Sequence, residues 1–258
     1  MRYGCCTDIK NYALLEELGY DCIELEGKAV HAMDDAAFEA AAATVAAGKI
    51  PCNGVNAYCP PSLSIVGPGF DPDAVRAYAE RLLPRVRRLG GKTAGIGAPA
   101  SRKLPEGFDR ALARRQLLDF LRITGEVAAR EGITLLLEPL TPKSCNFLNY
   151  TDEAREIVEE VNSPGLFMVY DLFHALGAGE DVEPLKRAMP YVRHLHVSTD
   201  EPEGRGYLRD GYWEVFKPML AYIRESGYDG TFSVEANIGD VVEGAASTLR
   251  ILKQQLGR

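Results

Sequence analysis

The chain has 258 residues, in which 29 lysines and arginines stand against 37 aspartates and glutamates, giving a formal net charge of −8. This acidic balance argues against a nucleic-acid partner, because binding to phosphates depends on cationic side chains. No apolar run approaches the roughly 18 residues that cross a membrane, and no low-complexity linker divides the chain, so we expect one domain over residues 1–258 without a membrane partner.

Strand-like apolar runs and helix-like segments alternate through the first half of the chain. Gly19 is a typical C-terminal stop for the first helix, and Asp34 can cap the alanine-rich second helix. Asp71 and Pro72 are typical of a helix start, and Pro84 is expected to kink that third helix. The predicted strands are 3–6, 22–25, 54–58 and 93–97, and the predicted helices cover about 12–18, 34–47, 71–90 and 111–130.

The second half continues this alternation with four more strands and four more helices. The strands are 134–138, 166–171, 192–196 and 231–235, and the helices lie near 152–161, 182–188, 214–225 and 240–255. Strict alternation of strands and helices predicts parallel strands with right-handed crossovers, and a length of about 250 residues suits a closed (β/α)8 barrel. An open doubly wound sheet is the alternative, but no G-x-G-x-x-G motif follows the first strand.

Four ionisable residues end the four strands of the second half. They are Glu138, Asp171, His196 and Glu235, and each closes an apolar run. A charge at the end of a buried strand costs desolvation energy unless something at that rim compensates it. Reactive groups of such barrels lie at the carboxyl ends of the strands, so these four side chains can converge on one ion. Three carboxylates and one imidazole therefore predict a divalent-cation site and a metal-dependent enzyme.

Other basic side chains follow these strand ends or precede them closely. His174 lies three positions beyond the aspartate, where the sixth strand leaves for its helix. Arg205 belongs to the long polar loop after the seventh strand and is a candidate to lie near the four ionisable residues. Arg209 is an alternative candidate for that position. His194 shares a strand face with the predicted ligand two residues later, and it is a candidate for the core or for a supporting role. His31 has no such context, so we expect it at the surface.

The cysteine pattern bears on the compartment of the protein. The sequence contains six cysteines and no C-x-x-C pair, and three of the cysteines lie in strand-like runs. We expect reduced, buried thiols rather than disulfides or a cysteine metal site. The N-terminal segment lacks the apolar core of a signal peptide, so we expect a cytoplasmic protein. The sequence leaves open whether the chain forms a homo-oligomer.

Several short motifs resemble those of the xylose-isomerase-like superfamily of TIM-barrel sugar and sugar-phosphate isomerases and epimerases. They are Leu-Glu-Pro-Leu at 137–140, Asp-Leu-Phe-His at 171–174, His-Leu-His at 194–196 and Ser-Val-Glu at 233–235. The resemblance runs over essentially the whole chain, and it is close to the ketose 3-epimerases of the tagatose and psicose type. It implies a fold, a metal site and a reaction class, but it says little about the substrate.

The resemblance also implies roles for individual residues. The implied metal ligands are Glu138, Asp171, His196 and Glu235. The two glutamates would also form the catalytic acid–base pair, and His174 would touch substrate oxygens. The epimerases usually carry a second glutamate where this chain has Ser144, and an arginine where it has Pro202, so Arg205 is a shifted candidate for substrate binding. Both departures weaken the case for a free ketohexose as substrate.

The implied chemistry is the removal and return of a proton beside a carbonyl, through a metal-stabilised enediolate. Two opposed glutamates suit epimerisation, whereas one glutamate that shuttles a proton between adjacent carbons gives aldose–ketose isomerisation. The oxygen-rich ligand set fits Mn²⁺ or Mg²⁺ first, and Zn²⁺ or Co²⁺ second. One divalent ion per chain is therefore the expected cofactor.

The expected substrate is a small polyhydroxy carbonyl compound, either a sugar or a sugar phosphate. The cations near the predicted rim are Arg102, Lys103, Lys143, Arg205 and Arg209. They could serve a phosphate, but no loop resembles a backbone phosphate cradle, and a phosphate-free substrate is slightly favoured.

Other functions remain open at this stage. A dehydratase of inosose or dehydroshikimate type would begin with the same proton abstraction and continue by β-elimination. An inactive sugar-binding relative is the non-enzymatic alternative, and the intact ligand set argues against it. An apurinic endonuclease would need more histidine ligands than a chain with four histidines and a net charge of −8 offers.

Overall fold

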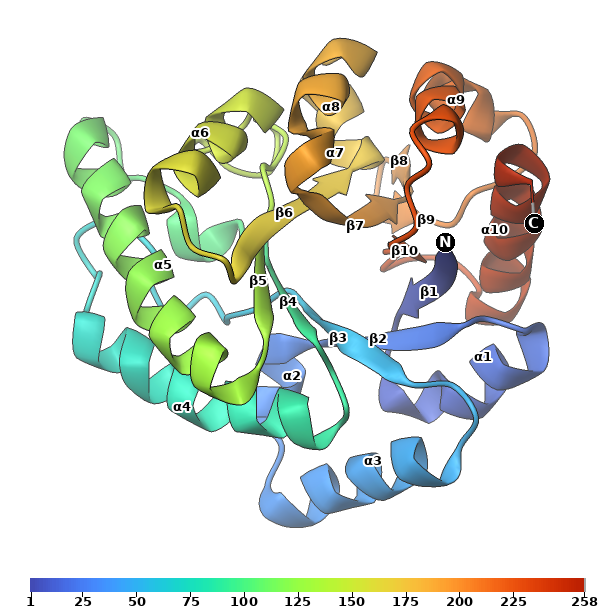
Figure 1. Ribbon diagram of the computed structural model, residues 1–258, viewed down its shortest axis with the longest axis horizontal. Helices are drawn as coiled ribbons and strands as arrows, with labels where there is room; N and C mark the ends of the chain where they lie inside the picture. The colour runs from blue at the N-terminus through green and yellow to red at the C-terminus, as the bar shows by residue number, and fades with distance from the viewer. Residues whose placement is uncertain (258) are drawn as a thin grey trace.

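Eight parallel strands form a closed barrel in the computed structural model, which describes residues 1–257 (Figure 1). Hydrogen-bonded neighbours follow the order β1-β10-β7-β6-β5-β4-β3-β2, and β1 pairs with both β2 and β10, which closes the ring. The strands are β1 Arg2–Cys6, β2 Cys22–Glu26, β3 Cys52–Asn56, β4 Thr93–Ile96, β5 Thr134–Leu137, β6 Leu166–Asp171, β7 Val192–Val197 and β10 Thr231–Val234. The predicted (β/α)8 barrel is confirmed, and the open sheet is excluded.

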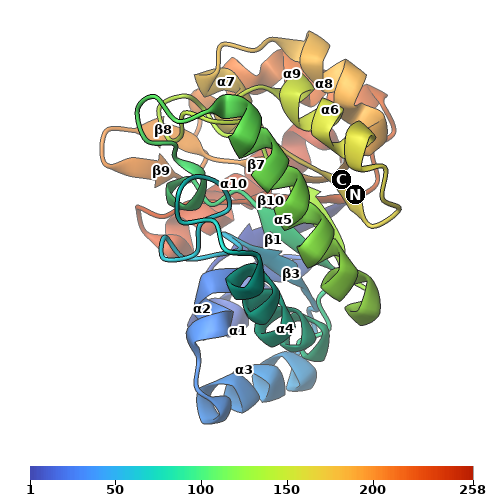
Figure 2. The same cartoon turned by 90° about the vertical axis from the view of Figure 1, so that its left-hand side faces the viewer.

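Helices surround the barrel, and eight of them follow the strands where the sequence predicts them (Figure 2). These are α1 Tyr12–Leu18, α3 Asp35–Ala47, α4 Pro72–Arg88, α5 Arg110–Glu131, α6 Thr151–Val161, α8 Val182–Ala188, α9 Lys217–Glu225 and α10 Val241–Leu256. Single 3-10 turns cover Ile9–Asn11, Ala100–Arg102, Met189–Tyr191 and Tyr212–Phe216. Within residues 1–257, no helix combines the length and the apolar character that crossing a membrane requires.

The prediction of strict alternation was wrong at two places. The short helices α2 Gly27–Ala32 and α7 Leu172–Gly177 are additional, and each has six residues. Each begins directly after a strand, with no intervening turn residues. Its hydrophobic periodicity covers too few residues to distinguish the helix from a continuation of that strand. The polar loop after β7 is also more regular than expected, because it forms the antiparallel hairpin of β8 Thr199–Glu201 and β9 Gly204–Gly206.

Aspartate caps begin several of the outer helices, as the sequence indicates. The Asp34 carboxylate accepts a hydrogen bond from the Ala37 amide, and Asp71 caps the first turn of α4, where Pro72 is the first helical residue. Gly19 ends α1 in the left-handed conformation at φ 81°, which a glycine adopts without steric cost. Pro84 lies inside α4, and the helix continues past it to Arg88.

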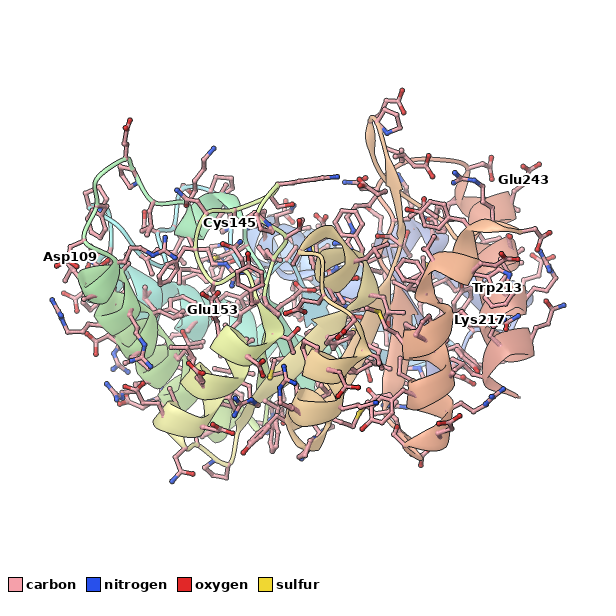
Figure 3. All side chains as sticks on the ribbon, turned by 90° about the horizontal axis from the view of Figure 1, so that it is seen from above. Asp109, Cys145, Glu153, Trp213, Lys217 and Glu243 are labelled. Atoms are coloured by element: carbon pink, nitrogen blue, oxygen red, sulfur yellow. The ribbon has the colours of Figure 1, made fainter. Side chains whose placement is uncertain are left out.

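Parallel strands bring their carboxyl ends to one side of the barrel, and the helices begin on that side. Figure 3 shows α5 and α10 beginning on the same side of the molecule, at Asp109 and near Glu243. On the outside of the barrel, Leu82 of α4 and Phe120 of α5 are fully buried in one core cluster with Val55 of β3. Truncating such a side chain to alanine typically costs about 2–5 kcal/mol, so this packing holds the strand ends in place.

All six cysteines of the chain are buried free thiols, which confirms the sequence prediction. Burial raises the pKa of Cys52 to about 12 and the pKa of Cys59 to about 11. The thiolate is the reactive form of cysteine, so these two groups are almost entirely unreactive near neutral pH.

We therefore expect a thiol reagent at mildly alkaline pH to label the folded chain much more slowly than the unfolded chain. In guanidinium all six thiols should react at the rate of a free cysteine. The measurement is the time course of Ellman's reagent with and without denaturant. Rapid labelling of several thiols in the folded protein would contradict the burial of these side chains.

Candidate active site

The four ionisable residues predicted at the strand ends lie together in the structure. Glu138 follows β5, Asp171 ends β6, His196 lies in β7, and Glu235 follows β10. One nitrogen or oxygen atom from each of them forms a group in which all the atoms are within 4.8 Å of one another. The first three side chains are buried and Glu235 is half-buried, so the group sits at the inner edge of the barrel mouth.

Backbone hydrogen bonds explain why these side chains converge. Asp171 is in register with His196 across β6 and β7. The Glu235 amide donates to the Val197 carbonyl at 3.0 Å, and the Glu138 amide donates to the carbonyl of β4 at 3.2 Å, so the strand pairing continues beyond the last strand residues. At Gly97 a Cβ would collide with the Glu138 carboxylate. A glycine there leaves room for the glutamate.

The electrostatics of the group favour a cation. Burial raises the pKa of Glu138 to about 7, a hydrogen bond from His196 opposes this rise, and the charges of Glu235 and Asp171 add to it. His196 Nδ1 lies 3.4 Å from a Glu138 oxygen and 3.5 Å from a Glu235 oxygen. Three crowded carboxylates with one imidazole nitrogen form a donor set that suits a divalent ion, which would relieve their mutual repulsion. The residues present therefore fit a metal.

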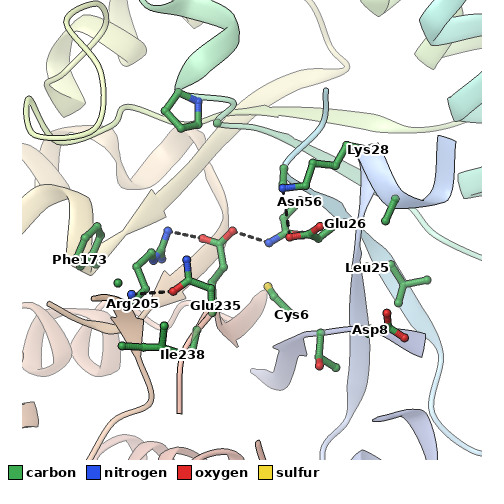
Figure 4. A pocket seen from close by; sticks show the side chains of 18 of the residues that line it. Cys6, Asp8, Leu25, Glu26, Lys28, Asn56, Phe173, Arg205, Glu235 and Ile238 are labelled. Atoms are coloured by element: carbon green, nitrogen blue, oxygen red, sulfur yellow. Dashed lines mark hydrogen bonds and ion pairs between the residues drawn. The ribbon is translucent and has the colours of Figure 1, made fainter. Parts of the chain in front are cut away.

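Arg205 enters this group from the β8–β9 hairpin. Its guanidinium forms an ion pair with Asp171, and its Nη1 lies 2.7 Å from Glu235 Oε2. Figure 4 shows Arg205 on one side of the Glu235 carboxylate and Asn56 on the other. The Asn56 amide donates to Glu235 Oε1 at 2.5 Å. The structure thus places the predicted Arg205 at the centre of the site.

His174 lies at the same end of the barrel, on α7. The Thr141 amide donates to His174 Nδ1 at 3.2 Å, and His174 Nε2 is 3.4 Å from a guanidinium nitrogen of Arg205. Burial, and then the positive charge of Arg205, hold the pKa of His174 well below its usual value. The imidazole is therefore neutral near neutral pH, and it can exchange hydrogen bonds with a bound hydroxyl group.

The other cations expected at the rim lie outside this group. Arg209 is exposed and forms an ion pair with Glu201, so it is not the arginine that reaches the carboxylates. The expectation of Arg102 as a rim cation is wrong, because its side chain is fully buried and its Nη2 donates to the Glu138 backbone carbonyl at 2.7 Å. A charged loop residue is expected to be exposed to solvent, whereas the buried Arg102 side chain supports the Glu138 backbone.

A residue that the sequence analysis passed over lies inside the barrel. Glu24 of β2 is buried, and its Oε2 lies 2.9 Å from His194 Nε2 and 3.3 Å from His196 Nε2. Burial would raise the pKa of Glu24, but the charges and hydrogen bonds of the two histidines hold that pKa well below its usual value. His194 is fully buried, as expected for a core or supporting residue, and His31 is half-buried against Tyr78 rather than fully at the surface. A lone carboxylate inside an apolar strand was the signal that could have identified Glu24.

A cavity of about 1080 Å³ opens over these residues (Figure 4). Among the residues that line it are Glu138, His174, Arg205 and Glu235. The volume exceeds that of a single small sugar, and the floor combines carboxylates, an imidazole and a guanidinium. Such a site can bind hydroxyl and carbonyl oxygens, hold a cation and move protons.

Comparison with known proteins relates the chain to one family of barrel proteins. The sequence pattern of the xylose isomerase-like TIM barrel family matches residues 12–255. The chain is 29% identical to a 2-oxo-tetronate isomerase of Cupriavidus necator over 163 residues, which are 60% of this chain and 58% of that protein. It thus spans less than two thirds of that relative's length.

Two solved structures share the fold at low sequence identity. The structure of a 3-keto-D-glucoside 4-epimerase from Escherichia coli superposes with a TM-score of 0.81 at 19% identity, covering 98% of this chain and 99% of the other. A structure of the IolI protein with a bound zinc atom gives a TM-score of 0.77 at 19% identity, with 99% and 98% coverage. At this level of identity the likeness concerns the fold alone.

Proposed function

The chain belongs to the xylose isomerase-like TIM barrel family, and on that premise we propose that it is a divalent-metal-dependent carbohydrate isomerase or epimerase. The observation that carries the proposal is the group of four donor atoms within 4.8 Å at the carboxyl ends of adjacent strands. Two of the proteins to which the chain is similar are named as an isomerase and an epimerase of compounds that carry a keto group. Their names support a reaction beside a carbonyl.

The proposed ligands of the ion are Glu138, Asp171, His196 and Glu235. Mn²⁺ or Mg²⁺ suits three carboxylates and one imidazole best, and the zinc atom in the structure of a fold relative supports a divalent ion more generally. When bound, the ion would supply Lewis-acid stabilisation of the negative charge that develops on the substrate oxygens. The side chains of the protein itself would transfer the protons and hold the substrate.

Glu138 and Glu235 are the proposed acid–base pair. They extend from β5 and β10, which flank β6 and β7 in the barrel order, so they approach the reacting carbon from two directions. One carboxylate would remove the proton beside the carbonyl, and the other would return a proton to the opposite face of the resulting enediolate. Arg205 and His174 would hold substrate oxygens, because both reach the carboxylate group and line the cavity.

The charges at the rim support a substrate without phosphate. Lys143 forms an ion pair with Asp200 at 2.8 Å, and Arg209 is paired with Glu201. These two cations are already neutralised by acidic partners, and Arg205 is held by the carboxylates of the site. A phosphorylated sugar would have to break such pairs, so we propose a phosphate-free polyhydroxy carbonyl compound of mono- or disaccharide size.

A panel assay in deuterium oxide tests this function. The panel holds ketoses, ketose phosphates, 2-oxo sugar acids, 3-keto glycosides, hydroxypyruvate and inosose, each with Mn²⁺, Mg²⁺, Co²⁺ or Zn²⁺. We expect at least one phosphate-free compound to turn over, with solvent deuterium entering at the carbon next to the carbonyl.

The products separate the alternatives. Turnover with no deuterium in substrate or product would contradict the enediolate route and favour hydride transfer. Loss of water from the substrate would instead identify a dehydratase on the same barrel, since both reactions begin with the same proton abstraction. Chelator-treated protein serves as the blank.

A further inference from the structure

Glu24 is a buried carboxylate on the opposite side of the barrel interior from the proposed ligands. It is 2% exposed, and it does not line the cavity at the mouth. Burying a charge is unfavourable unless hydrogen bonds and neighbouring charges compensate the lost solvation. Three polar groups meet at one Glu24 oxygen, because the Cys6 thiol donates to Oε2 at 3.3 Å, beside the Nε2 atoms of His194 and His196. A carboxylate held at this cost in the middle of a barrel calls for a function.

The two ring nitrogens of His196 face different groups. Nδ1 points toward the proposed metal site, at 3.4 Å from Glu138 and 3.5 Å from Glu235. Nε2 points the other way, toward Glu24 Oε2 at 3.3 Å. A neutral imidazole that binds a metal through one nitrogen carries its proton on the other. With Nδ1 as the ligand, the proton belongs on Nε2, where Glu24 accepts it.

We propose that Glu24 is a positioning residue that fixes the tautomer and the ring orientation of His196, so that Nδ1 is presented to the metal. The inference rests on the proposed metal site. A carboxylate that accepts a hydrogen bond from the second ring nitrogen of a metal-binding histidine also increases the basicity of the ligand nitrogen. Glu24 thereby acts on the ion and the substrate only through His196.

Contacts from the other end of the barrel also reach Glu24 Oε2. The Asn53 amide oxygen accepts a hydrogen bond from Arg2 at 2.9 Å, so its amide nitrogen faces His194 Nδ1, at 3.5 Å. On the other side of the ring, His194 Nε2 lies 2.9 Å from Glu24 Oε2. A chain of polar contacts from Arg2 through Asn53 and His194 therefore reaches the carboxylate and restricts its movement.

A second metal ion is the competing role for this cluster. Cys6, Glu24 and His196 offer three donor atoms that lie close enough together for an ion. In that arrangement His196 would bridge two ions and would have to lose both ring protons. Loss of the second ring proton of an imidazole is far less favourable than loss of the first, which favours a proton over an ion at this position.

The test compares metal affinity and the tautomer of His196 in wild type and Glu24→Gln. A glutamine can turn its amide NH₂ toward Nε2, which moves the ring proton to Nδ1 and blocks the ligand. We expect Mn²⁺ and Zn²⁺, titrated against a chromogenic chelator, to bind about 10–100-fold more weakly. In Zn²⁺-saturated protein with ¹⁵N-labelled histidine, the wild type should show His196 bound to the ion through Nδ1 and protonated at Nε2, with that proton in a hydrogen bond to Glu24 that the variant weakens. Only four histidines contribute signals.

Two further variants separate positioning from a general loss of structure. Glu24→Asp keeps the charge at a greater distance, and it should restore part of the affinity. Cys22→Ser changes another fully buried side chain of β2, whose thiol faces the Tyr3 carbonyl, and it should leave metal affinity unchanged. A merely structural role would lower the melting temperature of metal-free Glu24→Gln without changing the metal affinity of the folded fraction.

Each remaining outcome has a definite consequence. Unchanged metal affinity in folded Glu24→Gln, or a wild-type His196 that binds the ion through Nε2, overturns the inference. Two ions per wild-type chain and one in the variant would overturn it as well, because Glu24 would then be a ligand. A wild type that binds no ion sinks the proposed function, whereas a wild type that binds one ion and a folded Glu24→Gln that binds it equally well sink only the positioning role of Glu24.

Discussion

Replacing Glu138 or Glu235 by glutamine should reduce kcat by about 10²–10⁴-fold, the usual contribution of a positioned acid–base group. The amide keeps the size of the side chain but cannot accept the proton. Steady-state kinetics on the substrate found in the panel assay give the comparison, and the metal content of each variant is measured in the same preparation. Glu126→Gln, on the exposed face of α5 and paired with Arg76, is the matched control and should keep wild-type activity.

The stability of these variants separates a chemical role from damage to the fold. Because burial and the neighbouring carboxylates raise the pKa of Glu138 to about 7, its ionised form is unfavourable in the metal-free site. A raised pKa in the folded state means that stability from this group is lost as the pH rises through that value. Metal-free Glu138→Gln should therefore unfold at the same temperature as the wild type, or higher, in mildly alkaline buffer. Wild-type turnover with metal bound would rule out the assigned role of that glutamate.

The parts of the site that follow from strand periodicity could be predicted from the sequence. Glu138, Asp171, His196 and Glu235 each close an apolar run, and the carboxyl ends of parallel strands must meet at one rim. The convergence of their side chains therefore follows once the alternation of strands and helices is recognised. The N-caps Asp34 and Asp71 were predictable for a similar reason, because a cap acts on backbone groups two or three residues away.

The parts that depend on distant contacts were out of reach. Glu24 meets His196 across 172 positions of sequence, and whether a carboxylate in the middle of a strand points inward depends on the closure of the barrel. Arg205 reaches Asp171 only because the segment before it folds into the β8–β9 hairpin, which a polar sequence does not specify. Arg102 is buried by the packing of its loop, whereas its charge alone suggests a side chain exposed to solvent.

Removal of the metal should abolish turnover and lower the melting temperature together. A ligand present at 100 times its dissociation constant stabilises the folded state by about 2.7 kcal/mol, and for a chain of this size each kcal/mol shifts the melting temperature by about 2–4 °C. We therefore expect a melting temperature about 5–10 °C lower after dialysis against a chelator. Adding Mn²⁺ should restore activity and melting temperature over the same range of concentrations.

Asp171→Asn sharpens this prediction, because it removes one carboxylate from the proposed ligand set and one partner from Arg205. The variant should need much more Mn²⁺ for the same gain in melting temperature. Asp200→Asn is the matched control, since Asp200 is an exposed rim aspartate that pairs with Lys143 at 2.8 Å and lies outside the ligand group. Its Mn²⁺ dependence should match the wild type. Full activity of wild-type protein with far less than one ion per chain would show that the carboxylates serve another purpose, with Arg205 as the cation that compensates them.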